Sequence, residues 1–112
     1  MPVSAEKLIR FYGVEEGETK ERCGFVLKGN RLVEVENVHP HPEDGFEIDP
    51  KAIMRHEDQL KGTWHTHPQG SATLSEEDYA CFLNWPQLEH YIIAKDEVRC
   101  FTVENGIVMN AY

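Results

Sequence analysis

The chain has 112 residues, which is enough for one domain with a modest hydrophobic core. Its apolar fraction of 40% and charged fraction of 28% are ordinary values for a water-soluble protein. The formal net charge of −9, from 11 basic and 20 acidic residues, argues against nucleic-acid binding by phosphate neutralisation and favours a basic partner or substrate surface.

No apolar run approaches the length of a transmembrane helix, so we expect no membrane partner. The first residues have neither the basic start nor the apolar core of a signal peptide, which predicts a cytoplasmic location. The cysteines, Cys23, Cys81 and Cys100, are odd in number and have no CxxC spacing. This pattern predicts free thiols in a reducing compartment.

Helical and strand patterns alternate along the chain. Ser4 is a candidate N-cap for a helix that continues to about Tyr12 and ends at Gly13. Further elements are predicted, in order, as a strand at 21–28, its hairpin partner at 31–38, an extended piece at 46–48, a helix from about 49 to 60, a strand at 61–67, a helix at 75–84, a strand at 90–95, and strands at 98–103 and 107–111. Asn105-Gly106 is a strong signal for a type I′ turn between the last two strands. This order predicts a single α/β domain over residues 1–112 that closes with a β-hairpin.

The most informative stretch is His65-Thr66-His67-Pro68, which ends a buried strand and is followed six residues later by Ser75-Glu76-Glu77-Asp78. Residues two apart in a strand point to the same face, so His65 and His67 present two imidazoles side by side. Asp78 lies in the first turn of the following helix. Two imidazoles and one carboxylate can hold Zn²⁺ and leave a fourth position open, which is typical of a catalytic zinc site.

Taken singly, each half of this motif has a purely structural interpretation. Ser75 and Asp78 match the spacing of a helix capping box, and the two histidines can be polar residues at a strand edge. The combination is much rarer, because this composition would produce it by chance in roughly 10⁻⁵ of such chains. The cap and the ligand are also compatible, since Asp78 lies one turn from Phe82 at the margin of the helix's apolar face.

The motif resembles the zinc motif of the JAB/MPN/Mov34 (JAMM) metalloprotease family. That family also requires a glutamate on an earlier strand, usually just before Cys-Gly, and Glu21-Arg22-Cys23-Gly24 supplies it here. The resemblance implies an α/β fold with a curved mixed sheet packed by helices, related in architecture to cytidine deaminases. It also implies zinc held by His65, His67 and Asp78.

By the same resemblance, Glu21 and Ser75 are the catalytic residues. A carboxylate at Glu21 can take a proton from a zinc-activated water and pass it to the leaving amine. The Ser75 hydroxyl can donate a hydrogen bond to the oxyanion of the tetrahedral intermediate. The implied reaction is hydrolysis of a peptide or isopeptide bond.

Other candidate sites are less favoured. His39-Pro40-His41-Pro42 repeats the His-x-His-Pro pattern, but no Ser and Asp follow at the required spacing, so a structural or solvent-exposed histidine pair is expected. Cys23 lies two residues from Glu21 and is a minor alternative ligand. Two imidazoles and a carboxylate would also accept iron or cobalt.

Within the family, the short chain resembles the prokaryotic JAB branch, and the stretches around Asn37-Val38 and Phe46–Pro50 resemble the JAB domain of phage tail assembly proteins. Two functions follow. One is a zinc metallopeptidase acting on a peptide, a ubiquitin-like or sulfur-carrier protein, or a tail protein. The other is a tail-assembly or scaffold component that acts mainly by protein binding, and a phage-encoded protein of this kind would be virion-associated. Glu21 favours the enzyme, because a structural zinc needs no base.

Overall fold

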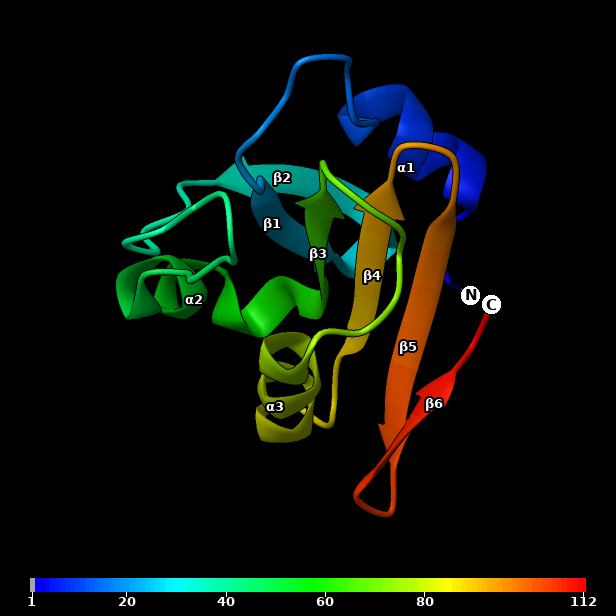
Figure 1. Ribbon diagram of the computed structural model, residues 1–112. Helices are drawn as coiled ribbons and strands as arrows, with labels where there is room; N and C mark the ends of the chain where they lie inside the picture. The colour runs from blue at the N-terminus through cyan, green and yellow to red at the C-terminus, as the bar shows by residue number, and fades with distance from the viewer. Residues whose placement is uncertain (1) are drawn as a thin grey trace.

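A six-stranded mixed sheet forms the centre of the molecule, which we describe from a computed structural model covering residues 2–112 (Figure 1). The strands are β1 (Cys23–Leu27), β2 (Arg31–Val35), β3 (Leu60–His67), β4 (Glu89–Ala94), β5 (Val98–Glu104) and β6 (Ile107–Asn110). Their order across the sheet is β2-β1-β3-β4-β5-β6. Only β3 and β4 pair in parallel among these strands. Parallel neighbours need a crossover, and a helix provides it.

Helices cover both faces of the sheet (Figure 1). They are α1 (Ala5–Tyr12), α2 (Pro50–His56) and α3 (Glu76–Asn84), and α3 is the crossover between β3 and β4. Leu8 of α1 packs with Trp64 and Tyr91. The opposite face carries α2 and α3, where Ala52 packs on Phe25 and where Phe82, Ile92 and Phe101 form a separate cluster. Successive side chains of a strand point to opposite faces, so the same strands contribute to the hydrophobic core on each face of the sheet.

The helix caps and turns follow the sequence. The Ser4 side chain accepts a hydrogen bond from Lys7 N at the start of α1, and Gly13 is the C-cap. Asp49 caps α2, with Pro50 as its first residue. Asn105 and Gly106 both have positive φ, at 53° and 76°, as a type I′ turn requires. These local predictions are confirmed.

Several predicted boundaries are wrong. β1 begins at Cys23, so Glu21 precedes the strand, and β2 ends at Val35 instead of Val38. The predicted helix from 49 to 60 is α2 followed by a 3₁₀ turn, η2 (Glu57–Gln59), and β3 already begins at Leu60. Another 3₁₀ turn, η1 (Lys28–Asn30), joins β1 to β2. The extended piece expected at 46–48 is part of a loop, and Glu47 O accepts a hydrogen bond from Val38 N at 2.9 Å. Strand ends depend on pairing partners, which local sequence does not specify.

Gly24 leaves room for the side chain of Trp64, the largest of the core, to lie across β1 on one face of the sheet. A Cβ at this position would lie 2.0 Å from Val33 O and 2.7 Å from the Trp64 ring. With only hydrogen there, the fully buried Trp64 indole passes β1 and donates a hydrogen bond to Val33 O at 3.1 Å. The glycine after Cys23 therefore has a packing function in this fold.

Cys23, Cys81 and Cys100 are all free thiols. Within residues 2–112, no helix is both long enough and apolar enough to cross a lipid bilayer.

Candidate metal centre

His65 and His67 lie at the carboxyl end of β3, on the face that carries α2 and α3. His65 is fully buried, and the His67 side chain is 12% exposed. Their Nε2 atoms are 3.1 Å apart. Two ligands held about 2.0–2.1 Å from one tetrahedral zinc lie roughly 3.3 Å from each other, so this separation fits a shared metal.

Asp78 completes the group from the first turn of α3. Its Oδ1 lies 3.0 Å from His65 Nε2 and its Oδ2 lies 3.0 Å from His67 Nε2. The capping box predicted from the sequence also forms, since Ser75 Oγ accepts from Asp78 N and Ser75 N donates to Asp78 Oδ2. The cap fixes the carboxylate while it faces the histidines, so the capping role of Asp78 is compatible with a role as a ligand.

Glu21 reaches the same group from the segment before β1. One of its carboxylate oxygens lies within 4.8 Å of a ring nitrogen of both His65 and His67. Arg22 pairs with Thr66 in both directions, through Arg22 N to Thr66 Oγ1 and Thr66 N to Arg22 O, each at 2.9 Å. Because Thr66 stands between the two histidines, this pairing places Glu21 beside them although it lies outside the regular strand.

The hydrogen bonding of His67 prepares Nε2 to bind a cation. Its Nδ1 lies 2.9 Å from Ser71 O, and a carbonyl oxygen can only accept, so Nδ1 carries the hydrogen. In the neutral ring, Nε2 then has a bare lone pair that faces the Asp78 carboxylate. Two acceptors at this distance repel unless a proton or a metal ion lies between them. A backbone carbonyl on the second nitrogen is the usual support of a metal-binding histidine.

One unsatisfied atom in the centre points to the same need for a cation. Among residues 2–112, the buried Oε1 of Glu21 has no hydrogen-bond partner, and neither has the buried Nδ1 of His65, which is not the nitrogen that faces Asp78. Nitrogen and oxygen donors of this kind suit a borderline divalent ion such as Zn²⁺. Glu21, His65, His67 and Asp78 therefore fit a metal ion, with two imidazoles and one or two carboxylates as donors.

Burial and mutual charges set the protonation of the group. Burial lowers the pKa of His65 and favours the neutral, ligating ring. Burial opposes ionisation of Asp78, but hydrogen bonds and charge from the two histidines outweigh it and hold the pKa of Asp78 far below its usual range. Burial raises the pKa of Glu21 to about 7; His67 opposes this shift, whereas Asp78 adds to it.

Phe46 and Asn37 shape the centre and were not singled out as site residues from the sequence. The Phe46 ring stacks on His65 with centroids 4.3 Å apart. Asn37 makes four hydrogen bonds, donating to Glu21 O and Gly45 O and accepting from His39 N and Glu47 N, at 2.8–3.0 Å. It therefore ties the Glu21 backbone to the loop that carries Phe46. The sequence signal for both positions is the resemblance of the stretches around Asn37-Val38 and Phe46–Pro50 to a JAB domain, which assigns neither residue a role in the site.

The second His-x-His-Pro motif and Cys23 lie outside this group. His39 Nε2 pairs with Glu77 Oε1 of α3 at 3.0 Å, and its Nδ1 accepts from His41 N, so the histidine pair folds its own loop against α3. His41 is exposed. Cys23 Sγ is buried and directed to Val35 O at 3.8 Å, and burial raises its pKa to about 12, which makes it a poor ligand.

These observations define an α/β domain with a candidate divalent-metal centre between a strand end and a helix N-terminus. A family model described as prokaryotic homologs of the JAB domain matches residues 12–104. The chain therefore belongs to the JAB domain family, in its prokaryotic branch.

Comparison with solved structures supports the fold. The chain is similar to the solution structure of protein DSY2949 from Desulfitobacterium hafniense, with a TM-score of 0.69 and 22% sequence identity. The match covers 94% of this chain and 83% of that one. No curated protein matches the sequence.

Proposed function

We propose that this protein is a zinc-dependent metallopeptidase that hydrolyses a peptide or isopeptide bond. The observation that carries the proposal is the convergence of His65, His67 and Asp78, in which the hydrogen bond from His67 Nδ1 to Ser71 O leaves Nε2 as the nitrogen aimed into the group. Glu21 stands beside the same nitrogens. A structural metal site would need no such additional carboxylate.

His65, His67 and Asp78 would hold the zinc ion, which supplies Lewis-acid activation of water and of the scissile carbonyl. Glu21 takes the proton from the attacking water and passes it to the leaving amine. A pKa raised to about 7 suits this exchange, because a base works best when its pKa lies near the working pH.

Ser75 has a second role in this scheme. Its Oγ accepts from Asp78 N, and its own hydroxyl hydrogen is free to donate, because Ser75 is exposed at the start of α3. The hydroxyl donates to the oxygen that becomes negatively charged when the carbonyl is attacked. A positioned donor of this kind stabilises the transition state more than the ground state.

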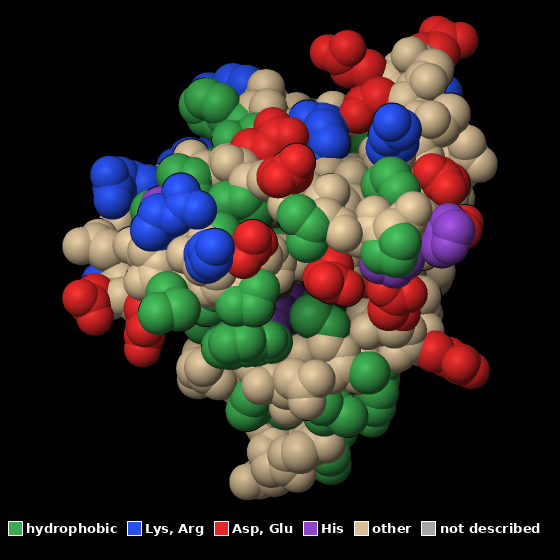
Figure 2. All heavy atoms as spheres, turned by 90° about the vertical axis from the view of Figure 1, so that its left-hand side faces the viewer, with side chains coloured by type: hydrophobic (Ala, Val, Ile, Leu, Met, Phe, Trp, Pro, Cys, Tyr) green, Lys and Arg blue, Asp and Glu red, His purple; other side chains and the backbone are tan. Residues whose placement is uncertain are grey.

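Several substrates fit the proposal: a peptide, a ubiquitin-like or sulfur-carrier protein cut near its C-terminal glycine, and a phage tail protein. The molecular face that bears α2 and α3 carries acidic side chains around the recess where histidine is visible (Figure 2). With a net charge of −9, this surface favours basic segments.

The proposal is tested with Glu21→Gln, which keeps the size of the side chain and removes the base. Zinc content should stay at the wild-type level, while kcat falls on the order of 10²–10⁴-fold. The assay would use a panel of peptides and a ubiquitin-like protein extended beyond its terminal glycine. Glu16→Gln, in an exposed loop position, is the matched control and should turn over normally. Full activity of Glu21→Gln on a confirmed substrate would refute the mechanism.

A further inference from the structure

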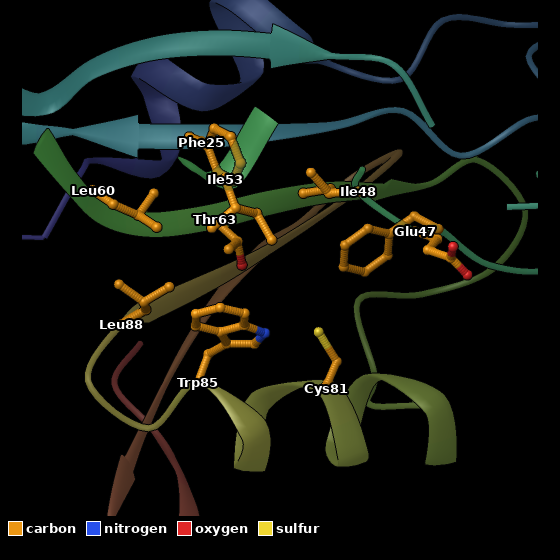
Figure 3. Close-up of a pocket in the computed structure, with 10 residues that line it drawn as sticks. Phe25, Glu47, Ile48, Ile53, Leu60, Thr63, Cys81, Trp85 and Leu88 are labelled. Carbon is orange, nitrogen blue, oxygen red and sulfur yellow. The ribbon is translucent and has the colours of Figure 1, made fainter. Parts of the chain in front are cut away.

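A mostly apolar cleft of about 190 Å³ lies between α2 and α3, over β1 and β3 (Figure 3). Phe25 and Thr63 line it from the sheet, Ile53 from α2, and Cys81 and Trp85 from α3 and its C-cap. For comparison, an apolar cavity of about 150 Å³ accepts a benzene ring. The cleft therefore has room for one large apolar side chain.

The cleft adjoins the candidate metal centre. Phe46 lines the cleft and also stacks on His65, with ring centroids 4.3 Å apart. On α3, Cys81 lines the cleft three residues after Asp78. A peptide held at the metal centre therefore has the cleft beside it, with the Phe46 ring in contact with both.

The polar groups of the cleft are few. The Thr63 hydroxyl donates a hydrogen bond to His90 Nδ1 at 2.8 Å. Nδ1 is the acceptor because His90 Nε2 carries the hydrogen that it donates to Trp85 O. Within residues 2–112, the Trp85 indole N–H makes no hydrogen bond, and its ring faces the cleft (Figure 3). The exposed Glu47 carboxylate lies at one end of the cleft (Figure 3). Apolar walls with a few placed polar groups are typical of ligand sites.

We propose that this cleft is a specificity pocket that takes a leucine- or methionine-sized side chain next to the scissile bond of the peptide substrate. The Trp85 N–H donates to a backbone carbonyl of the same residue. Glu47 disfavours an acidic residue there, since two carboxylates would repel each other. This inference rests on the proposed peptidase function, because it describes the occupant of the cleft as part of a substrate. Occupancy of the cleft can nevertheless be measured without catalysis.

The test is an NMR titration of the ¹⁵N-labelled, zinc-loaded full chain with N-acetyl-leucinamide. The chain has two tryptophans, and therefore two indole N–H signals. The Trp85 signal should shift and saturate with a Kd on the order of 1 mM, a value typical of a small fragment. The buried Trp64 indole, bonded to Val33 O, should not move. N-acetyl-alaninamide and N-acetyl-aspartamide should bind at least tenfold more weakly.

Two neighbouring residues of α2 give a matched pair of variants. Ile53→Gln puts a polar group into the cleft and should weaken leucinamide binding at least tenfold. Met54→Gln, on the same helix but 70% exposed, should leave it unchanged. Cys81→Leu fills the cleft with a larger apolar side chain and should also abolish binding. It provides a second test of the pocket in case Ile53→Gln does not fold.

The outcomes separate the two proposals. Equal shifts with the alanine and leucine probes, or a shift of Trp64 instead of Trp85, would overturn the pocket. A Trp85 shift that depends on protein concentration without any probe would assign the cleft to a second copy of the chain and also overturn it. Saturable leucinamide binding by a protein that never cleaves any peptide would keep the cleft as an apolar side-chain site and refute the peptidase.

Discussion

Asn37 holds the segment that carries Glu21 and the loop that carries Phe46 together. All four hydrogen bonds of its amide go to backbone groups, with Glu21 O and Gly45 O as acceptors of its N–H groups. Asn37→Asp would keep the two acceptor bonds but place a carboxylate against two carbonyl oxygens. The substitution therefore displaces Glu21 while His65 and His67 on β3 and Asp78 on α3 stay in place.

We expect Asn37→Asp to lower kcat about tenfold with little change in KM and with zinc content retained, because a shift of the base by a fraction of an ångström weakens only proton transfer. Steady-state kinetics and elemental analysis measure both quantities. Asn110→Asp, at an exposed position of β6, is the control. A loss of zinc together with activity would assign Asn37 a general structural role and contradict this positioning role.

The proposed scheme gives Ser75 a catalytic role besides its N-cap role, and the two can be separated by comparison with Ser4. Both serines are N-caps whose side chains accept from a backbone N–H three residues later. Each change to alanine should lower the free energy of unfolding by about 1 kcal/mol. Only Ser75→Ala should also lower kcat, on the order of 10²–10³-fold. Denaturant unfolding and kinetics on both variants decide the point, and equal kcat values would remove Ser75 from the mechanism.

At the scale of elements, His90 connects the end of α3 to the sheet. It is fully buried, bonded to Trp85 O and Thr63, and stacked on Phe82 at 4.2 Å. Burial lowers its pKa from 6.5 to about 4; the bond to Trp85 O only partly opposes this shift. The folded state thus binds fewer protons than the unfolded state between these two values.

This difference predicts a pH dependence with a definite sign. Stability is fully present above pH 6.5 and falls as the pH decreases towards 4, because the unfolded chain gains a proton that the folded chain resists. From pH 7 to pH 4 the wild type should lose about 3 kcal/mol more than His90→Gln, which cannot titrate. Urea unfolding at several pH values measures this, and parallel curves for the two proteins would contradict it.

Element types were predictable where a local chemical signal specified them. Ser4, Asp49 and Ser75 capped helices as expected, and Asn105-Gly106 formed the predicted turn. The start of β1 was not predictable, because its pairing with β3 decides it. The end of α2 was not predictable either, because no Gly or Pro stands between His56 and Leu60 to end the helix. The two hydrogen bonds between Arg22 and Thr66, which place Glu21, join residues 44 positions apart and leave no local signal.

At the scale of the whole molecule, the sequence motif found the residues that converge but not their surroundings. His65, His67 and Asp78 lie on one strand and the helix that follows it, so their convergence could be predicted from the spacing in the sequence alone. The cleft is lined by side chains from Phe25 to Leu88, and the stacking of Phe46 on His65 joins segments 19 positions apart. Such assemblies depend on the packing of α2 and α3 against one face of the sheet.

The most direct test of the metal centre is the metal content of the chain, measured by elemental analysis after purification without chelator. His67→Ala removes the nitrogen whose lone pair faces Asp78, and His41→Ala removes the exposed histidine of the second His-x-His-Pro motif as a matched control. We predict one zinc per chain in the wild type and in His41→Ala, and none in His67→Ala. Folded wild-type protein without metal that takes up no added Zn²⁺ would contradict the account and leave the histidines as structural residues.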